Sequence, residues 1–169
     1  MKIYLIGYMA SGKSHLGKEL SVRTGLEFVD LDEVFEEKYR IGILDFFDKY
    51  GEGTFRQLEH QCLLETASLD HVIIATGGGT ACTAENIEFI RENGTSFYIR
   101  LDLDLLTERL RKVKRQRPLL KNVPPCDLEQ FVKNQLEERE QFYLQANHVF
   151  QGPVTDFEPL VELIRGLMD

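Results

Sequence analysis

Short apolar runs alternate along the chain with longer segments in which apolar residues recur every three or four positions. The runs predict five strands at residues 2–6, 27–30, 71–75, 96–101 and 148–150. The longer segments predict helices between them and a last helix at about residues 158–168. This alternation is typical of a parallel sheet with helices on both faces. Ligands bind such sheets at the carboxyl ends of the strands, so the residues just after each strand are the informative ones.

Length and charge narrow the class of protein. The chain has 169 residues, which fits one domain with a substantial core, and it contains no repeat or low-complexity linker. Its net charge of −8 argues against a nucleic acid or an anionic membrane as partner. The sequence has no apolar run long enough to span a membrane, no signal peptide and no CxxC pair among its three cysteines. We therefore expect a cytoplasmic protein with reduced thiols.

The first predicted strand runs into the sequence GYMASGKS at residues 7–14, which matches the phosphate-binding pattern G-x-x-x-x-G-K-[ST]. Gly7 and Gly12 let the backbone turn its N–H groups toward an anion, and the helix that begins near Lys13 adds a positive dipole end. In this pattern the lysine reaches the β- and γ-phosphates and the Ser14 hydroxyl ligates Mg²⁺. The guanine-selecting sequence N-K-x-D is absent, and the strand at 71–75 ends in TGGG instead of an acidic residue. We therefore expect a small ATP-dependent phosphotransferase.

Two aspartates follow the second predicted strand in the sequence FVDLDEVFEE. Asp30 ends the strand and can approach Mg²⁺ through water, because Mg²⁺ keeps several waters and takes few carboxylates. Asp32 could orient an acceptor hydroxyl and take its proton. The alternative is that Asp32 caps the following helix and Glu33 interacts with the helix dipole.

Two arginines lie on helix faces that are otherwise apolar. Arg139 falls in the middle of the apolar arc of a helix predicted for residues 127–146. Arg56 lies at the edge of the apolar face of GEGTFRQLE, three residues from Glu59. A guanidinium at such a position needs an anionic partner. Internal ion pairs would provide one, and so would an acceptor that carries a carboxylate.

Two further segments have open interpretations. Gly77, Gly78 and Gly79 follow the third strand and permit close backbone approach and conformations closed to other residues, either as a flexible loop or as a backbone that contacts a ligand. Residues 109–117 are strongly basic and precede Pro118. They are either solvated helix charges or part of a mobile lid that delivers Arg117 to the transferring phosphate and excludes water.

Taken together, GYMASGKS, FVDLDEVFEE, GEGTFRQLE, TGGGT, RPLL and LEEREQFY resemble the motifs of shikimate kinases, in the same order and over nearly the whole chain. The resemblance implies a single three-layer α/β/α domain with a P-loop, nucleoside-monophosphate-kinase-like fold and a five-stranded parallel sheet of order 2-3-1-4-5. It implies a shikimate-binding region at about residues 31–60 and a mobile lid at about residues 110–124. The implied reaction transfers the γ-phosphoryl of MgATP to the 3-hydroxyl of shikimate, in chorismate and aromatic amino acid biosynthesis. The expected enzyme is a monomer that uses Mg²⁺ and acts on the small molecules ATP and shikimate.

The resemblance also implies roles for individual residues. The catalytic residues would be Asp32, Lys13 and Arg117, and the Mg²⁺ ligands Ser14 and Asp30. The ATP-binding residues would be Gly7, Ala10, Ser11, Gly12, Lys13, Ser14, His15, Arg109, Arg111 and Arg117, with either Arg109 or Arg111 stacking on adenine. The shikimate-binding residues would be Asp32, Phe55, Arg56, Gly78, Gly79 and Arg139. Two features depart from the family pattern: Ala10 replaces a usual glycine, and VTDFEPLVE is shorter than the usual adenine loop.

Two alternative functions follow from the same residues. One is a kinase of the same fold that acts on another polyol acid, such as gluconate, against which the arginine pair and the three glycines argue. The other is a catalytically silent nucleotide-binding module, against which the intact set of Lys13, Ser14, Asp30 and Asp32 argues.

Overall fold

A computed structural model describes residues 1–113 and 118–168. Its centre is a five-stranded sheet in the order β2-β3-β1-β4-β5, with every pairing parallel. The strands are β1 (Lys2–Ile6), β2 (Glu27–Asp30), β3 (Val72–Ala75), β4 (Thr95–Arg100) and β5 (His148–Gln151). Each predicted strand is present within one residue at either end, and the predicted strand order is confirmed.

Seven α-helices are described: α1 (Lys13–Thr24), α2 (Leu31–Tyr39), α3 (Ile43–Glu65), α4 (Ala84–Asn93), α5 (Leu103–Val113), α6 (Leu128–Tyr143) and α7 (Glu158–Met168). Two short 3₁₀ segments, η1 (Thr66–Ser68) and η3 (Pro118–Leu120), complete the described helical structure. Apolar side chains of α1 and α7 pack on one face of the sheet, and those of α4, α5 and α6 pack on the other. The predicted three layers are therefore confirmed.

The central strands β1 and β3 are almost entirely apolar, because both faces of the sheet are covered there. Ile3 and Leu5 of β1 point toward α1 and α7, whereas Tyr4 and Ile6 point toward the opposite layer. All four are fully buried. Side chains alternate between the two faces of a strand. A strand that is buried on both faces therefore has apolar residues at consecutive positions.

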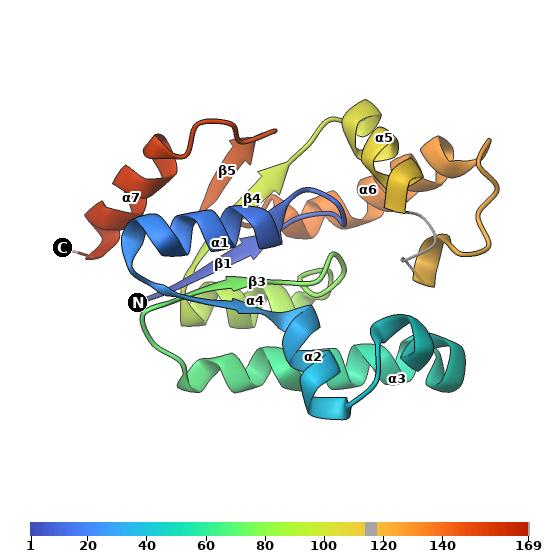
Figure 1. Ribbon diagram of the computed structural model, residues 1–169, viewed down its shortest axis with the longest axis horizontal. Helices are drawn as coiled ribbons and strands as arrows, with labels where there is room; N and C mark the ends of the chain where they lie inside the picture. Colours follow the sequence, from blue (N-terminus) through green and yellow to red (C-terminus); the bar gives the residue numbers. More distant parts are fainter. Residues whose placement is uncertain (114–117, 169) are drawn as a thin grey trace.

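The strands all point the same way, so their carboxyl ends form one edge of the sheet, on the right in Figure 1. The loops that follow β1 and β3 meet there with the first turn of α2, which directly follows β2. A third apolar cluster, formed by Phe35, Phe46, Phe55 and Cys62, joins α2 to α3 beside this edge. The helix α3 is interrupted at Gly51, whose φ of 79° and ψ of 168° are not helical, so residues 43–50 and 52–65 form two helical segments. A positive φ of this kind suits glycine.

Candidate active site

The loop after β1 is a tight phosphate-binding turn. Gly7 has φ 141°, and Gly12, with φ 99°, precedes the first residue of α1. Lys13 begins α1, and only 6% of it is exposed. Its ammonium group donates hydrogen bonds to the carbonyls of Gly7, at 2.8 Å, and Tyr8, at 2.9 Å. The loop therefore holds a buried cation at the amino end of a helix, where an anion is favoured.

Ala10 has an unusual backbone conformation within this loop. Its φ is 63°, in the left-handed region that side chains with a Cβ disfavour by about 1–2 kcal/mol. The departure from glycine noted in the sequence therefore falls on a residue whose conformation glycine would adopt without strain. The Ala10 carbonyl accepts a hydrogen bond from Arg109 Nη1 at 3.1 Å, a contact that helps to hold this geometry.

A cavity of about 220 Å³ lies over the loop. It is lined by Met9, Ala10, Gly12, Lys13, Ser14, His15, Asp32, Thr76 and Gly78. A smaller pocket of about 60 Å³ adjoins it, since both are lined by Gly12 and His15. The smaller pocket is completed by Ser11, Leu16, Ile99, Arg109, Pro153, Val154 and Phe157. Arg109 therefore lies beside the loop, whereas Arg111 is exposed and Arg117 lies outside the described residues.

Asp30, the last residue of β2, links α1 to α2. Its Oδ1 accepts a hydrogen bond from the backbone N–H of Asp32 at 3.0 Å and so caps the amino end of α2. Its Oδ2 accepts a hydrogen bond from the Ser14 hydroxyl at 2.5 Å. The alternative that Asp32 caps this helix is therefore wrong: the cap is Asp30, two residues earlier, which still has the extended backbone that a cap requires. Asp32 lies in the first turn, and its side chain lines a cavity instead.

A second, larger cavity of about 290 Å³ lies between the sheet edge and α3. Its lining comprises Met9, Asp30, Asp32, Glu33, Glu36, Gly42, Ile43, Leu44, Phe47, Phe55, Arg56, Glu59, Gly77, Gly78, Gly79, Pro118, Leu119 and Arg139. Its volume is near the lower end of the usual range for ligand sites, roughly 300–1,000 Å³. Met9, Asp32 and Gly78 line both this cavity and the one over the phosphate loop. Asp32 is thus the ionisable side chain at their junction.

Arg56 enters the larger cavity from α3 with its guanidinium held on several sides. Its Nη1 donates to Glu59 Oε2 at 2.7 Å, and its Nη2 and Nε donate to Glu52 Oε1 at 3.2 and 3.3 Å. Burial opposes the charge of Arg56, but the carboxylates of Glu59 and Glu52 outweigh it and raise the pKa of the guanidinium. Three of its five N–H groups are used in these bonds, which leaves one on each Nη for a further acceptor.

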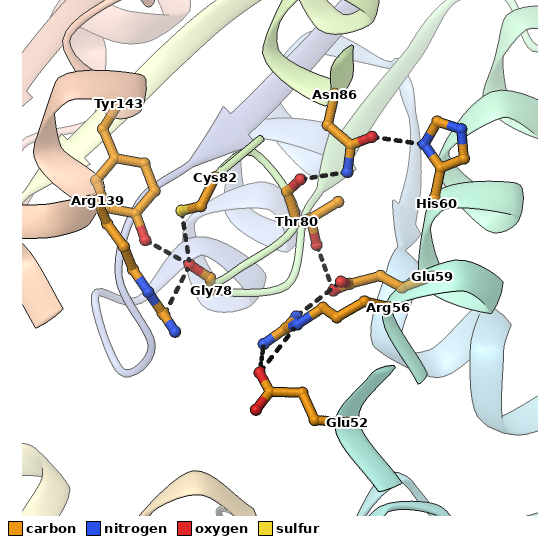
Figure 2. A network of polar contacts seen from close by, with 10 residues as sticks. All are labelled: Glu52, Arg56, Glu59, His60, Gly78, Thr80, Cys82, Asn86, Arg139 and Tyr143. Carbon is orange, nitrogen blue, oxygen red and sulfur yellow. Dashed lines mark hydrogen bonds and ion pairs between the residues drawn. The ribbon is translucent and has the colours of Figure 1, made fainter. Parts of the chain in front are cut away.

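Arg139 reaches the same cavity from α6, on the other side of the loop after β3 (Figure 2). Its Nη1 donates to the Gly78 carbonyl at 3.4 Å, and its guanidinium lies over the Tyr8 ring, 5.5 Å from the ring centre. The Tyr143 hydroxyl, one turn further along α6, donates to the same carbonyl. Burial raises the pKa of this hydroxyl well above its usual value, so it stays a neutral donor.

The three glycines of this loop are required for close approach. None of them has a φ in the left-handed region, so the expectation of conformations closed to other residues is wrong. A Cβ on Gly77 would lie 2.6 Å from Glu59 Oε1, and a Cβ on Gly78 would lie 2.8 Å from the backbone nitrogen of Met9. A Cβ on Gly79 would lie 2.7 Å from both Nη atoms of Arg56. The loop can lie this close to Glu59, Met9 and Arg56 only because it has no side chains there.

Several residues of the site were not found from the sequence. Met9 lines both cavities from a variable position of the phosphate-binding pattern, where no rule singles it out. Ile43, Leu44 and Phe47 form an apolar wall of the larger cavity. The amphipathic pattern of the segment before Gly51 could have indicated these residues. Tyr143 and Thr80 lie within the motifs LEEREQFY and TGGGT, but the sequence contains no local signal for the hydrogen bonds that they make to distant segments.

The described part of the chain contains no group of three or more His, Cys, Asp or Glu side chains able to hold a metal ion. A Mg²⁺ that also binds phosphates needs only one or two protein ligands, so this does not conflict with a site at Ser14 and Asp30. Among the described helices, none combines the length and the apolarity that crossing a membrane requires.

Comparison with known proteins agrees with this geometry. A family profile described as shikimate kinase matches residues 9–158. A shikimate kinase from Azobacteroides pseudotrichonymphae genomovar. CFP2 is 41% identical over 150 residues, which are 88% of this chain and 88% of the relative. The crystal structure of shikimate kinase from Bacteroides thetaiotaomicron has a TM-score of 0.88 and 35% identity, over 99% of this chain and 98% of that one. The shikimate kinase from Acinetobacter baumannii in complex with shikimate has a TM-score of 0.85 and 32% identity, over 99% and 92% of the two chains. This chain belongs to the shikimate kinase family.

Proposed function

We propose that the protein transfers the γ-phosphoryl group of MgATP to the 3-hydroxyl of shikimate, giving shikimate 3-phosphate and ADP. The observation that carries this proposal is the arrangement of the two larger cavities. One lies on the phosphate-binding loop, the other contains two arginines, and Asp32 lines both. A donor phosphate in the first cavity and an acceptor acid in the second would meet at this aspartate.

The acceptor side recognises a carboxylate. Arg56 and Arg139 approach consecutive residues of one loop, Gly79 and Gly78, from two different helices. Planar guanidinium groups suit bidentate binding of a carboxylate, and two of them on one cavity favour an acidic acceptor over a neutral sugar. Phe55 supplies an apolar wall for the ring, and the backbone of Gly78 and Gly79 lies near enough to contact it.

Asp32 positions the acceptor hydroxyl at the junction of the cavities and accepts its proton as the new O–P bond forms. Phosphoryl transfer has a loose transition state that needs little help from a base, so orientation is the larger part of this role. Rigid positioning is available because Asp32 lies in the first turn of α2, whose backbone is tied to the Asp30 carboxylate.

The donor side holds the nucleotide by its phosphates. The backbone of the phosphate loop and Lys13 bind the β- and γ-phosphates and stabilise the charge that develops on them. Ser14 and Asp30 are the residues that would hold Mg²⁺, and their hydroxyl and carboxylate oxygens are the hard donors that this ion prefers. When bound, Mg²⁺ neutralises negative charge on the phosphates. Of the two candidate arginines, Arg109 is favoured for the nucleobase, because it lines the small pocket next to Gly12 and His15.

Three parts of this proposal have support from the sequence only. Arg117 would assist the transferring phosphate, and residues at about 110–124 would close as a lid that excludes water. The protein would act as a monomer in the cytoplasm. Pro118 and Leu119, two described residues of this segment, line the acceptor cavity.

Coupled measurement of ADP release with MgATP and a panel of acceptors tests the function. Shikimate should be turned over much faster than gluconate or a nucleoside monophosphate. Turnover of one of these but not of shikimate would overturn the assignment. Tight ATP binding without turnover of any acceptor would instead indicate a silent nucleotide-binding module.

A further inference from the structure

The carboxylate that holds Arg56 is itself held by a buried hydroxyl. Glu59 is only 5% exposed, and its Oε1 accepts a hydrogen bond from Thr80 Oγ1 at 2.6 Å. Thr80 is completely buried and directly follows Gly79 in the loop that lines the acceptor cavity. The position of the loop and the position of Arg56 are therefore coupled through one carboxylate.

Further hydrogen bonds connect the loop to Asn86 of α4, and Asn86 to His60 of α3 (Figure 2). The Thr80 carbonyl accepts a hydrogen bond from Asn86 Nδ2 at 2.6 Å, and Asn86 Oδ1 lies 2.5 Å from His60 Nδ1. Asn86 is held in the first turn of α4, where its backbone N–H donates to the capping Thr83. Glu59 and His60 are neighbours in α3. The four residues Glu59, Thr80, Asn86 and His60 therefore close a ring, through the Thr80 carbonyl and the α3 backbone, that joins α3, the glycine loop and α4.

The hydrogen bonds of this ring require a proton on Nδ1 of the His60 imidazole. Asn86 must direct its amide N–H at the Thr80 carbonyl, since the reverse orientation would set two oxygens against each other at 2.6 Å. Its amide oxygen then faces His60 and can only accept. His60 Nδ1 is therefore a donor. In a histidine without such a hydrogen-bond partner, nothing fixes the proton on this nitrogen. The other nitrogen, Nε2, faces the exposed Glu85 carboxylate at 3.5 Å.

We propose that His60 is a positioning residue of the acceptor site. Its Nδ1–H group orients Asn86, which fixes Thr80 and with it Glu59 and the Gly77–Gly79 loop, so that the Arg56 guanidinium meets the acceptor carboxylate. His60 does not line any of the three cavities, so it acts only through the ring. The inference rests on the proposed function, in which Arg56 binds the carboxylate of the acceptor.

A matched set of variants tests the positioning role. His60→Leu removes the donor and should raise KM for shikimate roughly 3- to 10-fold, the factor typical of one lost hydrogen bond, with KM for ATP unchanged. His60→Asn ends in an amide near the level of Nδ1 and should restore the wild-type KM. Glu85→Gln removes the charge beside Nε2 but leaves the ring intact, so its KM for shikimate should equal that of the wild type. An unchanged KM for shikimate in His60→Leu, or equal rises in both KM values, would overturn the proposal.

The protonated nitrogen gives a test that needs no activity. Long-range ¹H–¹⁵N spectra should be recorded over a series of pH values, with His60 assigned by comparison with His60→Asn. Nδ1 of His60 should carry a proton throughout, and a form protonated on Nε2 alone would refute the ring even if His60→Leu failed to fold. A wild-type protein that did not phosphorylate shikimate would contradict the proposed function, whereas the tautomer would still report on the ring by itself.

Discussion

The sharpest prediction concerns Gly79→Ala. The new Cβ would lie 2.7 Å from Nη1 and Nη2 of Arg56 and 2.8 Å from its Cζ, so it would press on the face of the guanidinium. Ordinary contact begins near 3.4 Å, and the guanidinium must therefore retreat by about 0.7 Å. The clash falls on the end of a flexible side chain that is 29% exposed, so the fold can absorb it at little cost.

The retreat should damage acceptor binding far more than stability. A misplacement of about 1 Å in a positioning group can reduce catalysis by roughly 100-fold. For Gly79→Ala we expect kcat/KM for shikimate to fall about 10- to 100-fold, which corresponds to ~1.4–2.7 kcal/mol of transition-state stabilisation. KM for ATP should change little, because Gly79 does not line the cavity over the phosphate loop.

Steady-state kinetics in both substrates, together with thermal melting, check this prediction. Gly78→Ala is the contrasting variant, since its Cβ would lie 2.8 Å from the backbone nitrogen of Met9, which cannot rotate away. It should impair the use of both substrates and lower Tm. Gly166→Ala, with no atom within 4 Å of its Cβ, is the control and should leave kinetics unchanged. An unaltered kcat/KM for shikimate in Gly79→Ala would refute the placement of Arg56 in the acceptor site.

Four further outcomes are expected. Ala10→Gly should raise the free energy of unfolding by about 0.5–1 kcal/mol in urea denaturation, because it relieves a left-handed φ; a destabilised variant would contradict this strain. Arg139→Ala should weaken shikimate binding more than ATP binding in calorimetric titrations, and equal losses would favour a purely structural role for its contacts with Gly78 and Tyr8. Lys13→Met should lower kcat by at least ~100-fold with an unchanged circular dichroism spectrum, and a rate near that of the wild type would exclude phosphate contact. Chelation of Mg²⁺ should abolish ADP release and its return should restore it, and activity that survived chelation would remove the metal role of Ser14 and Asp30.

Much of the fold follows from local patterns. Apolar runs locate the five strands, and they are longest in the central strands β1 and β3, which are buried on both faces. The phosphate-binding loop is also predicted from the sequence alone, since its functional residues lie close together in the segment from Gly7 to Ser14. The sequence also marks Arg139 and Arg56 as anomalies, because a charge on an apolar helix face requires a partner.

Pairings between distant segments could not be predicted in this way. The packing of the helices on the sheet decides that two arginines from α3 and α6 approach Gly79 and Gly78. The same holds for the ring of Glu59, Thr80, Asn86 and His60, whose members lie in three separate segments.

The chain by itself therefore determined its strands, its helices and the type of chemistry, because periodicity and turn geometry act over a few neighbouring residues. Tertiary structure alone decided which side chains share a cavity and why the three glycines are needed. The physical reason is that close packing depends on the distances between segments far apart in the sequence, and a missing Cβ has an effect only where another segment occupies its place.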